Sequence, residues 1–398
     1  MKLKTIALLG STGSIGQSTL EIIKKTKQFK VILIIANSNF SKIISQIKNF
    51  KPKVIVINNL KTYLKTKKIK KFKNIIILNN LINIKKYIKK IDITVSAIPG
   101  IAGLEPTLIF TKLSKKVLLA NKESIVCGWQ LIKKNAKKYK TQLIPIDSEH
   151  FSILQLTKQY SKEEIEKIYI TASGGPFLYL DKKKFKNIKP EEATKHPKWK
   201  MGKKISVDSA TLMNKVLELT EALKLFPYSL DKYEILIHPQ SLVHAIVQFK
   251  NGTTHFLYHS PDMKIPIANA LFDGKFNYAE YFSANNTIDI SDQNLEFFQA
   301  DTKKFLTLRL IPKMNSSVSG PVIINAANEI FVDQFLKKNI RFNDILSYLN
   351  LVLKDKDYIK TSNMSSNSIK NIYKIDQWAR NLAFKIILNK NTATSNNA

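Results

Sequence analysis

Three glycines at even spacing, Gly10, Gly13 and Gly16, constrain the fold more than any other feature of the chain. They follow a short apolar run, Thr5 to Leu9, and precede a segment of helical periodicity, Gln17 to Ile23. A strand, a tight turn and a helix in this order let backbone N–H groups approach a pyrophosphate. The spacing predicts a dinucleotide-binding unit, and the alternative is a tight turn without a ligand.

Apolar runs typical of buried strands recur through the first part of the chain, separated by lysine-rich segments of helical character. They are Val31–Ile35, Val54–Ile57, Ile75–Leu78, Ile93–Ala97, Val117–Ala120 and Leu143–Ile146. Strands that alternate with helices predict an α/β fold, here a Rossmann-like, doubly wound parallel sheet over residues 1–147.

The rest of the chain divides into four parts by its patterns. We expect a central α+β catalytic and connective domain with an open sheet over residues 148–272, because strand candidates occur at Ile168–Ala172, Glu234–His238 and Ala245–Phe249. Residues 273–300 are rich in Asn, Asp and Ser and are expected to form a linker. Helical patterns predict a C-terminal α-helical domain over 301–389, and the polar residues 390–398 are expected to be a disordered tail.

The formal net charge of +34 raises the question of a phosphate-bearing macromolecular partner. Only three of the 64 basic residues are arginine, the residue preferred for bidentate base and phosphate recognition. We therefore expect solvated lysine faces, with no nucleic acid and no membrane as partner. The single Cys127, the lack of an apolar run of about 20 residues and an N-terminus without a signal peptide favour the cytoplasm.

Two acidic motifs predict a cation site of oxygen ligands. Asp147 and Glu149 are two apart, so in an extended segment they face one ion while Ser148 faces elsewhere. Glu218 supplies a third carboxylate. Such ligands suit Mg²⁺ or Mn²⁺, with Co²⁺ as a third candidate, rather than structural zinc. The alternative is that all three are surface carboxylates, which is the commoner fate of acidic residues.

The second motif also predicts a phosphate site. If a helix opens near Ser209, Asn214, Lys215 and Glu218 share one face, and the helix start attracts an anion beside Ser209. Together the two motifs indicate a phosphorylated substrate that chelates a metal.

Nine motifs, in order along the chain, resemble those of the 1-deoxy-D-xylulose 5-phosphate reductoisomerase family. They are Gly10–Gly16, Leu119–Ser124, Asp147–His150, Ser173–Phe177, His196–Gly202, Val207–Glu218, His238–Ser241, Pro261–Met263 and Asn325–Glu329. The resemblance implies an NADPH- and divalent-metal-dependent enzyme of isoprenoid precursor synthesis. It rearranges and reduces 1-deoxy-D-xylulose 5-phosphate to 2-C-methyl-D-erythritol 4-phosphate, and it is expected to be a homodimer.

The resemblance also implies a role for each matching residue. The metal falls to Asp147, Glu149 and Glu218, and the orientation of substrate oxygens to Lys122 and Ser148. Ser173, Ser209, Asn214 and Lys215 correspond to the positions that hold the phosphate. Residues 196–204 correspond to a flap, in which His196 and Trp199 meet the substrate and Gly202 lies near the cofactor. The other cofactor positions are Thr12, Gly13, Ser14, Ile15, Asn121 and Glu123.

The second strand ends in Ala36-Asn37-Ser38-Asn39, without the carboxylate that would hold the ribose diol of NAD. This favours NADP, with Ser38 and Asn39 as donors to the 2′-phosphate. Asn37 and Ser38 depart from the family, which commonly has a basic residue in this trio, so nearby Lys42 is a candidate for the missing charge.

Two other functions are compatible with a nucleotide-binding fold. One is a Rossmann dehydrogenase that acts without a metal on a semialdehyde or hydroxy acid, which metal-independent turnover would reveal. The other is a basic nucleic-acid-binding protein, which salt-dependent binding would reveal.

Overall fold

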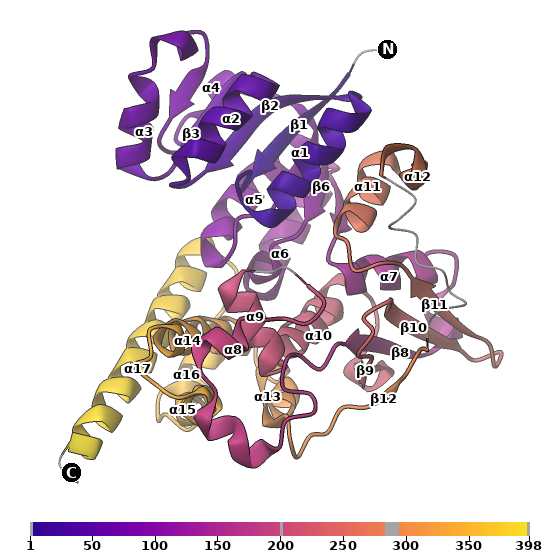
Figure 1. Ribbon diagram of the computed structural model, residues 1–398, viewed down its shortest axis with the longest axis vertical. Coiled ribbons are helices and arrows are strands. Elements are labelled where there is room, and N and C mark those ends of the chain that lie inside the picture. Colours follow the sequence, from indigo (N-terminus) through magenta and orange to yellow (C-terminus); the bar gives the residue numbers. More distant parts are fainter. Residues whose placement is uncertain (1–2, 200–201, 283–293, 396–398) are drawn as a thin grey trace. The chain divides into compact units, whose positions relative to one another are not determined.

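The computed structural model describes residues 3–199, 202–282 and 294–395, with side chains to residue 390 (Figure 1). Contacts gather in two compact units. The first comprises residues up to Ser124, Trp129–Phe151 and the described part of Asp262–Ile288. The second comprises Ile125–Gly128, Ser152–Pro261 and the described part of the remainder. Among the described residues no helix combines the length and the apolar character needed to cross a bilayer.

The first unit contains a parallel seven-stranded sheet in the order β4-β3-β2-β1-β5-β6-β7. Its strands are β1 (Lys4–Leu9), β2 (Phe29–Ala36), β3 (Val54–Ile57), β4 (Ile76–Leu78), β5 (Ile91–Ser96), β6 (Ser114–Leu119) and β7 (Gln142–Pro145). The helices between them are α1 (Ser14–Thr26), α2 (Phe40–Phe50), α3 (Leu60–Lys67), α4 (Ile84–Tyr87), α5 (Leu104–Thr111) and α6 (Lys122–Tyr139), and α7 (Ser148–Thr157) follows β7. All seven expected strands are confirmed, and so is the doubly wound sheet.

Burial on both faces explains why these strands read as unbroken apolar runs. In β1, Ile6 and Leu8 join one core cluster, whereas Ala7 and Leu9 join another. Side chains alternate between the two faces of a strand, so each face of the central strand contributes to its own core. The strand order reverses between β1 and β5, and such a switch point is where open α/β sheets bind ligands.

A segment far along the chain returns to this first unit. Helix α11 (Lys264–Phe272) packs on α1, and α12 (Tyr278–Tyr281) follows it. Buried Lys116 of β6 donates to the Ala270 carbonyl over 3.1 Å and pairs with Asp273, so it satisfies the C-terminal end of α11. Residues 262–272, expected within the central domain, therefore pack with the nucleotide-binding sheet, and so do the first residues of the expected 273–300 linker. Most of that linker, residues 283–293, lies outside the described residues.

The second unit is built on a five-stranded sheet in the order β11-β10-β8-β9-β12. Its strands are β8 (Ile165–Ala172), β9 (Tyr233–Ile237), β10 (Val243–Phe249), β11 (Thr254–Tyr258) and β12 (Phe298–Gln299). The three expected strands are confirmed. The two edge strands, β11 and β12, were not expected, because no residue of β11 is fully buried and β12 has only two residues, so neither reads as a buried apolar run.

Helices make up the remainder of the second unit. They are α8 (Pro190–Ala193), α9 (Lys203–Ala210), α10 (Met213–Leu225), α13 (Leu310–Asn315), α14 (Gly320–Leu336), α15 (Phe342–Leu353), α16 (Tyr358–Ser362) and α17 (Ile369–Ser395). The helical character expected after residue 300 is confirmed. Residues 390–395, expected to belong to a disordered tail, are helical instead, because α17 continues to Ser395. The last three residues, 396–398, lie outside the described part of the chain. Extending an existing helix costs less than nucleating one, so polar residues can continue it.

Candidate functional site

The glycine turn after β1 packs closely against the carboxyl ends of the two neighbouring strands, β2 and β5. Gly10 has a φ of +89°, and its N–H donates to the Ile35 carbonyl over 2.9 Å. A Cβ atom at Gly10 would lie 2.5 Å from the Ala97 carbonyl oxygen. Helix α1 then starts at Ser14, and Gly13 at its N-cap provides no side-chain cap. The first N–H groups of α1 have no acceptor within the helix and suit a pyrophosphate.

The loop between β2 and α2 is open and uncharged. Asn37, Ser38 and Asn39 are all exposed, and the Asn39 side chain caps α2 by accepting from the Lys42 N–H over 3.1 Å. Thr62 of α3 donates to the Ser38 carbonyl over 3.3 Å. No carboxylate stands in this loop, so nothing in it repels the 2′-phosphate of NADP.

Polar residues occupy the carboxyl end of β6, as the sequence predicts. Asn121 caps α6, and its Oδ1 accepts from the Ser124 N–H over 2.8 Å. Its Nδ2 donates to Glu123 over 2.9 Å and to the Gly100 carbonyl over 3.2 Å. Both Asn121 and Glu123 are buried, so the cap fixes them at the sheet edge. The next strand along this edge, β7, leads to Asp147.

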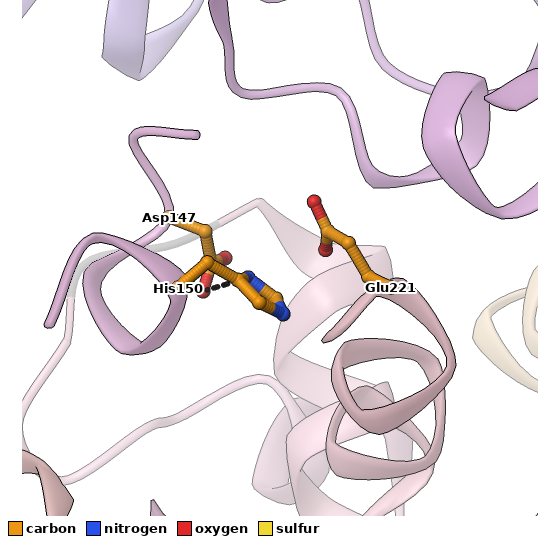
Figure 2. A group of neighbouring side chains, drawn as sticks. All are labelled: Asp147, His150 and Glu221. Atoms are coloured by element: carbon orange, nitrogen blue, oxygen red, sulfur yellow. Dashed lines mark ion pairs between the residues drawn. The ribbon is translucent and has the colours of Figure 1, made fainter. Parts of the chain in front are cut away.

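The Asp147 carboxylate lies beside the Lys122 ammonium and the His150 ring and is held ionised. It pairs with Lys122 on one side, and His150 Nδ1 lies 3.3 Å from its Oδ1 (Figure 2). Burial by itself would raise the pKa of Asp147, but the Lys122 ammonium and His150 hold it well below its usual value. An anionic carboxylate is the form that a hard divalent cation binds. Lys122 and Asp147 form one ion pair at the carboxyl edge of the sheet.

The local geometry around Asp147 differs from the expectation. Strand β7 ends at Pro145 and α7 begins at Ser148, so Asp147 and Glu149 do not alternate along an extended segment. The Asp147 carbonyl accepts the first α7 bond, from the Phe151 N–H over 2.8 Å, and Glu149 sits in the first turn. Ser148 Oγ donates to Glu149 Oε2 over 2.6 Å. A helix start suits acidic side chains, which explains why this motif is helical.

In the second unit, Asn214, Lys215 and Glu218 share one face of α10, as predicted. Both Asn214 Nδ2 and Lys215 Nζ contact the Glu218 carboxylate, and Lys215 and Glu218 are almost fully buried. The expected helix start near Ser209 is wrong. Ser209 lies in the last turn of α9, and α10 starts at Met213 after Leu212, whose φ is +58°. The left-handed conformation of Leu212 separates α9 from α10, so Asn214 and Lys215 lie in the first turn of α10.

Ser173 and His196 are joined within the same unit. The His196 Nδ1 accepts from the Lys198 and Trp199 N–H groups over 3.1 and 2.9 Å, and its Nε2 lies 2.9 Å from Ser173 Oγ. Burial and the Lys215 charge lower the pKa of His196 to about 4. The ring is therefore neutral at pH 7, its proton is on Nε2, and it donates to Ser173.

Trp199 packs edge-on against His244, with ring centroids 5.9 Å apart. His244 stacks on His259 at 3.9 Å, and burial beside His259 holds the pKa of His244 well below its usual value. The indole thus rests on the His244 ring, which is neutral at pH 7. Gly202 is exposed at the N-cap of α9. Two flap residues, 200 and 201, lie outside the described residues.

Two buried acids of the second unit escaped the sequence reasoning. Asp208 is 1% exposed and is held by Lys204 at 3.0 Å and by Asn328 Nδ2 at 2.8 Å. Glu221 on α10, drawn in Figure 2, is also 1% exposed. The signal for Glu221 was its helical spacing of three from Glu218. Asp208 directly precedes Ser209, but its partner Asn328 is 120 positions away.

Three family models match consecutive parts of the chain. Residues 6–128 match the model of 1-deoxy-D-xylulose 5-phosphate reductoisomerase. Residues 143–226 match the model of the 1-deoxy-D-xylulose 5-phosphate reductoisomerase C-terminal domain, and residues 259–382 match that of the DXP reductoisomerase C-terminal domain.

Whole-chain comparisons agree. A 1-deoxy-D-xylulose 5-phosphate reductoisomerase of Pelagibacter ubique is 43% identical over 382 residues, which are 94% of this chain and 97% of that protein. A crystal structure of DOX-P reductoisomerase with NADPH, fosmidomycin and magnesium superposes with a TM-score of 0.90 at 33% identity, over 97% of this chain and 98% of the other. The structure of the 1-deoxy-D-xylulose 5-phosphate reductoisomerase from Zymomonas mobilis in complex with NADPH superposes with a TM-score of 0.87 at 34% identity. The match covers 97% of this chain and 99% of the other.

Proposed function

Because the chain belongs to the 1-deoxy-D-xylulose 5-phosphate reductoisomerase family, we propose that Asp147, Glu149 and Glu218 hold the divalent metal of that reaction. The protein catalyses the NADPH- and metal-dependent conversion of 1-deoxy-D-xylulose 5-phosphate to 2-C-methyl-D-erythritol 4-phosphate. This decides against a dehydrogenase that works without a metal. The observation that supports the ligand set is the ionised state of Asp147, which Lys122 and His150 maintain despite burial.

The donor chemistry fits Mg²⁺ or Mn²⁺, because all three side chains offer carboxylate oxygens. When bound, the metal polarises the substrate carbonyl and stabilises the charge that develops on its oxygens, and NADPH supplies the hydride. Lys122 is a cation beside Asp147, which places it to orient substrate oxygens. Ser148, hydrogen-bonded to Glu149, is proposed to contact the substrate from the same helix turn.

We assign the substrate phosphate to Ser173, Ser209, Asn214 and Lys215. Asn214 and Lys215 lie together in the first turn of α10, where the positive end of the helix dipole favours an anion. Neutral His196 donates to Ser173 Oγ, so the Ser173 hydroxyl is free to aim its own hydrogen at a phosphate oxygen. Ser209 lies one residue after Asp208, whose ties to Lys204 and Asn328 fix the end of α9.

The direct test of these assignments is NADPH oxidation with 1-deoxy-D-xylulose 5-phosphate, followed at 340 nm with and without Mg²⁺ or Mn²⁺. We expect turnover only when both metal and substrate are present. Replacing Asn214 by Ala should raise the KM for the substrate more than it lowers kcat, because a phosphate remote from the reacting carbons contributes uniform binding. A change confined to kcat would contradict the phosphate assignment.

We propose that residues 196–204 form a lid over the bound substrate, with Trp199 as its apolar cover. Binding of a phosphorylated substrate analogue should change the emission of Trp199 and slow proteolysis between His196 and Lys204. The chain has two further tryptophans, Trp129 and Trp378, so Trp199→Phe is the control that isolates the signal. Emission that responds equally in Trp199→Phe, with unchanged proteolysis, would rule out the lid.

The exposed β2–α2 loop supports a prediction about the cofactor. We propose that Asn37, Ser38 and Asn39 face the adenosine 2′-phosphate and that Thr12, Gly13, Ser14 and Ile15 face the pyrophosphate. Ser38→Arg should tighten NADPH binding roughly tenfold or more, because a charge-assisted bond to phosphate contributes about 1.5–3 kcal/mol, and it should leave NADH nearly unchanged. Parallel titrations of both cofactors measure this, and equal gains for both would refute the placement.

Asn121, Glu123 and Gly202 are proposed to contact the nicotinamide half of the cofactor, since Asn121 and Glu123 are fixed at the carboxyl end of β6.

A homodimer is also proposed. The edge strand β11 of the second sheet exposes 47% of Phe256, and a second copy would cover this surface. A cytoplasmic location is proposed because the chain contains a single cysteine, Cys127, and so cannot form an intrachain disulfide.

A further inference from the structure

Helix α2 is locked to the glycine turn by one buried side chain. Gln46 is 6% exposed, and its Nε2 donates to the Ser11 carbonyl over 2.8 Å. Ser11 Oγ donates back to Gln46 Oε1 over 2.7 Å. A reciprocal pair of buried hydrogen bonds fixes both partners, because breaking it would leave polar groups unsatisfied. The face of α2 that carries Gln46 therefore has a set position against the turn.

Lys42 lies one helical turn before Gln46, on the same face. Its Nζ is 3.5 Å from the Thr12 carbonyl oxygen, a long contact that places the ammonium beside the glycine turn. The Lys42 backbone N–H donates to the Asn39 side chain, which caps the start of α2. The side chain is half-buried, so its stem is guided while its charged end stays near solvent. This geometry sets a cation between the glycine turn and the β2–α2 loop.

Within the described part of the chain, no acidic side chain pairs with this cation. Helix α2, from Phe40 to Phe50, contains no Asp or Glu. Among the described residues no carboxylate pairs with Lys42. The three exposed residues that precede α2 carry no charge. The charge that an adenosine 2′-phosphate requires is therefore absent from the loop, whereas a cation without an acidic partner stands next to it on a fixed helix face.

We propose that Lys42 is the residue that selects NADPH, by pairing its ammonium with the adenosine 2′-phosphate. The inference rests on the proposed cofactor site, and it assigns the phosphate's charge partner to the α2 helix rather than to the loop. The ammonium approaches from the glycine-turn side, while Ser38 and Asn39 approach from the loop. NADH has no phosphate at this position, so Lys42 contributes little to its binding.

The test uses the full-length protein without substrate and measures binding of NADPH and NADH by calorimetry. Lys42→Met should weaken NADPH binding by about tenfold to hundredfold, the effect of one charge-assisted phosphate contact, and should change NADH by less than about twofold. The half-cofactor 2′,5′-ADP should lose affinity by the same factor as NADPH, whereas ADP should not. Lys42→Arg should keep the preference.

Lys48→Met is the matched control, because it removes one lysine from the exposed end of the same helix. It should leave both affinities unchanged. A Lys42→Met variant that weakens NADPH and NADH equally would overturn the proposal and assign Lys42 a structural role through Thr12. If wild type itself shows no preference for NADPH, the proposed 2′-phosphate site fails with it. A wild type that prefers NADPH while Lys42→Met has no effect refutes Lys42 alone.

Discussion

Glu218→Gln is expected to lower metal-dependent turnover by more than about a hundredfold at limiting Mg²⁺. Groups one layer behind a metal ligand already contribute about 10–100-fold to metal affinity or activity, and a direct anionic ligand contributes more. The replacement keeps the shape of the side chain, and its amide oxygen can accept from Asn214 or from buried Lys215, so the fold should persist. Far-UV circular dichroism of the variant checks this. Mn²⁺ titration followed by electron paramagnetic resonance should show a matching loss of metal affinity.

The matched control for this variant is Glu234→Gln, the same change on β9 of the same unit. Glu234 pairs with Lys167 near the surface, at 3.5 Å with both side chains about one third exposed, and is not part of the proposed ligand set. Its turnover should stay near wild type, because exposed pairs contribute little. Raising the metal concentration should partly rescue Glu218→Gln. Normal activity of Glu218→Gln at limiting Mg²⁺ would remove Glu218 from the metal site.

Gly10→Ala is expected to cause the largest loss of stability in the nucleotide-binding unit. The backbone φ of +89° costs an L-residue about 1–2 kcal/mol. The new Cβ would also lie 2.5 Å from the Ala97 carbonyl oxygen and 2.7 Å from its carbon. These are backbone atoms that cannot rotate away, so overpacking adds about 1–3 kcal/mol. Calorimetric thermal unfolding should show the loss, and NADPH binding should weaken with it.

Gly252→Ala separates the two causes. Gly252 has nearly the same φ, +87°, but a Cβ there meets nothing within 4 Å. This variant should therefore show only the backbone cost of about 1–2 kcal/mol, without an effect on NADPH binding. Equal destabilisation by the two substitutions would mean that the close approach of Ala97 to Gly10 is unimportant, and the steric account of the turn would then be wrong.

The central strands of the first sheet could be predicted because they are buried on both faces. Ile6 and Leu8 face one core and Ala7 and Leu9 the other, which leaves no position for a polar residue. The glycine turn could also be predicted, because glycines placed between a strand and a helix are a local signal. The close approach of Gly10 to the Ala97 carbonyl could not, because Ala97 is far away in the sequence. The face shared by Asn214, Lys215 and Glu218 followed from helical periodicity alone.

Backbone geometry at short junctions required the structure. Because Asp147 and Glu149 are two residues apart, the sequence predicted that they face the same side of an extended segment. The chain instead starts helix α7 at Ser148. The break between α9 and α10 occurs at Leu212, a residue with no intrinsic preference for positive φ. Packing of the buried residues around it selects that conformation, and no local sequence signal marks it.

The sequence by itself determined the parallel sheet, its glycine turn and the helix face that Asn214, Lys215 and Glu218 share. Only the tertiary structure decided that residues 262–282 return to the first sheet, where Lys116 pairs with Asp273, 157 positions away in the sequence. It also decided that Asn328 donates to Asp208, 120 positions away. Periodicity reports which face of an element is buried, because burial repeats every two or 3.6 residues. It carries no information about which distant element supplies the partner, since that choice is made by packing of the whole chain.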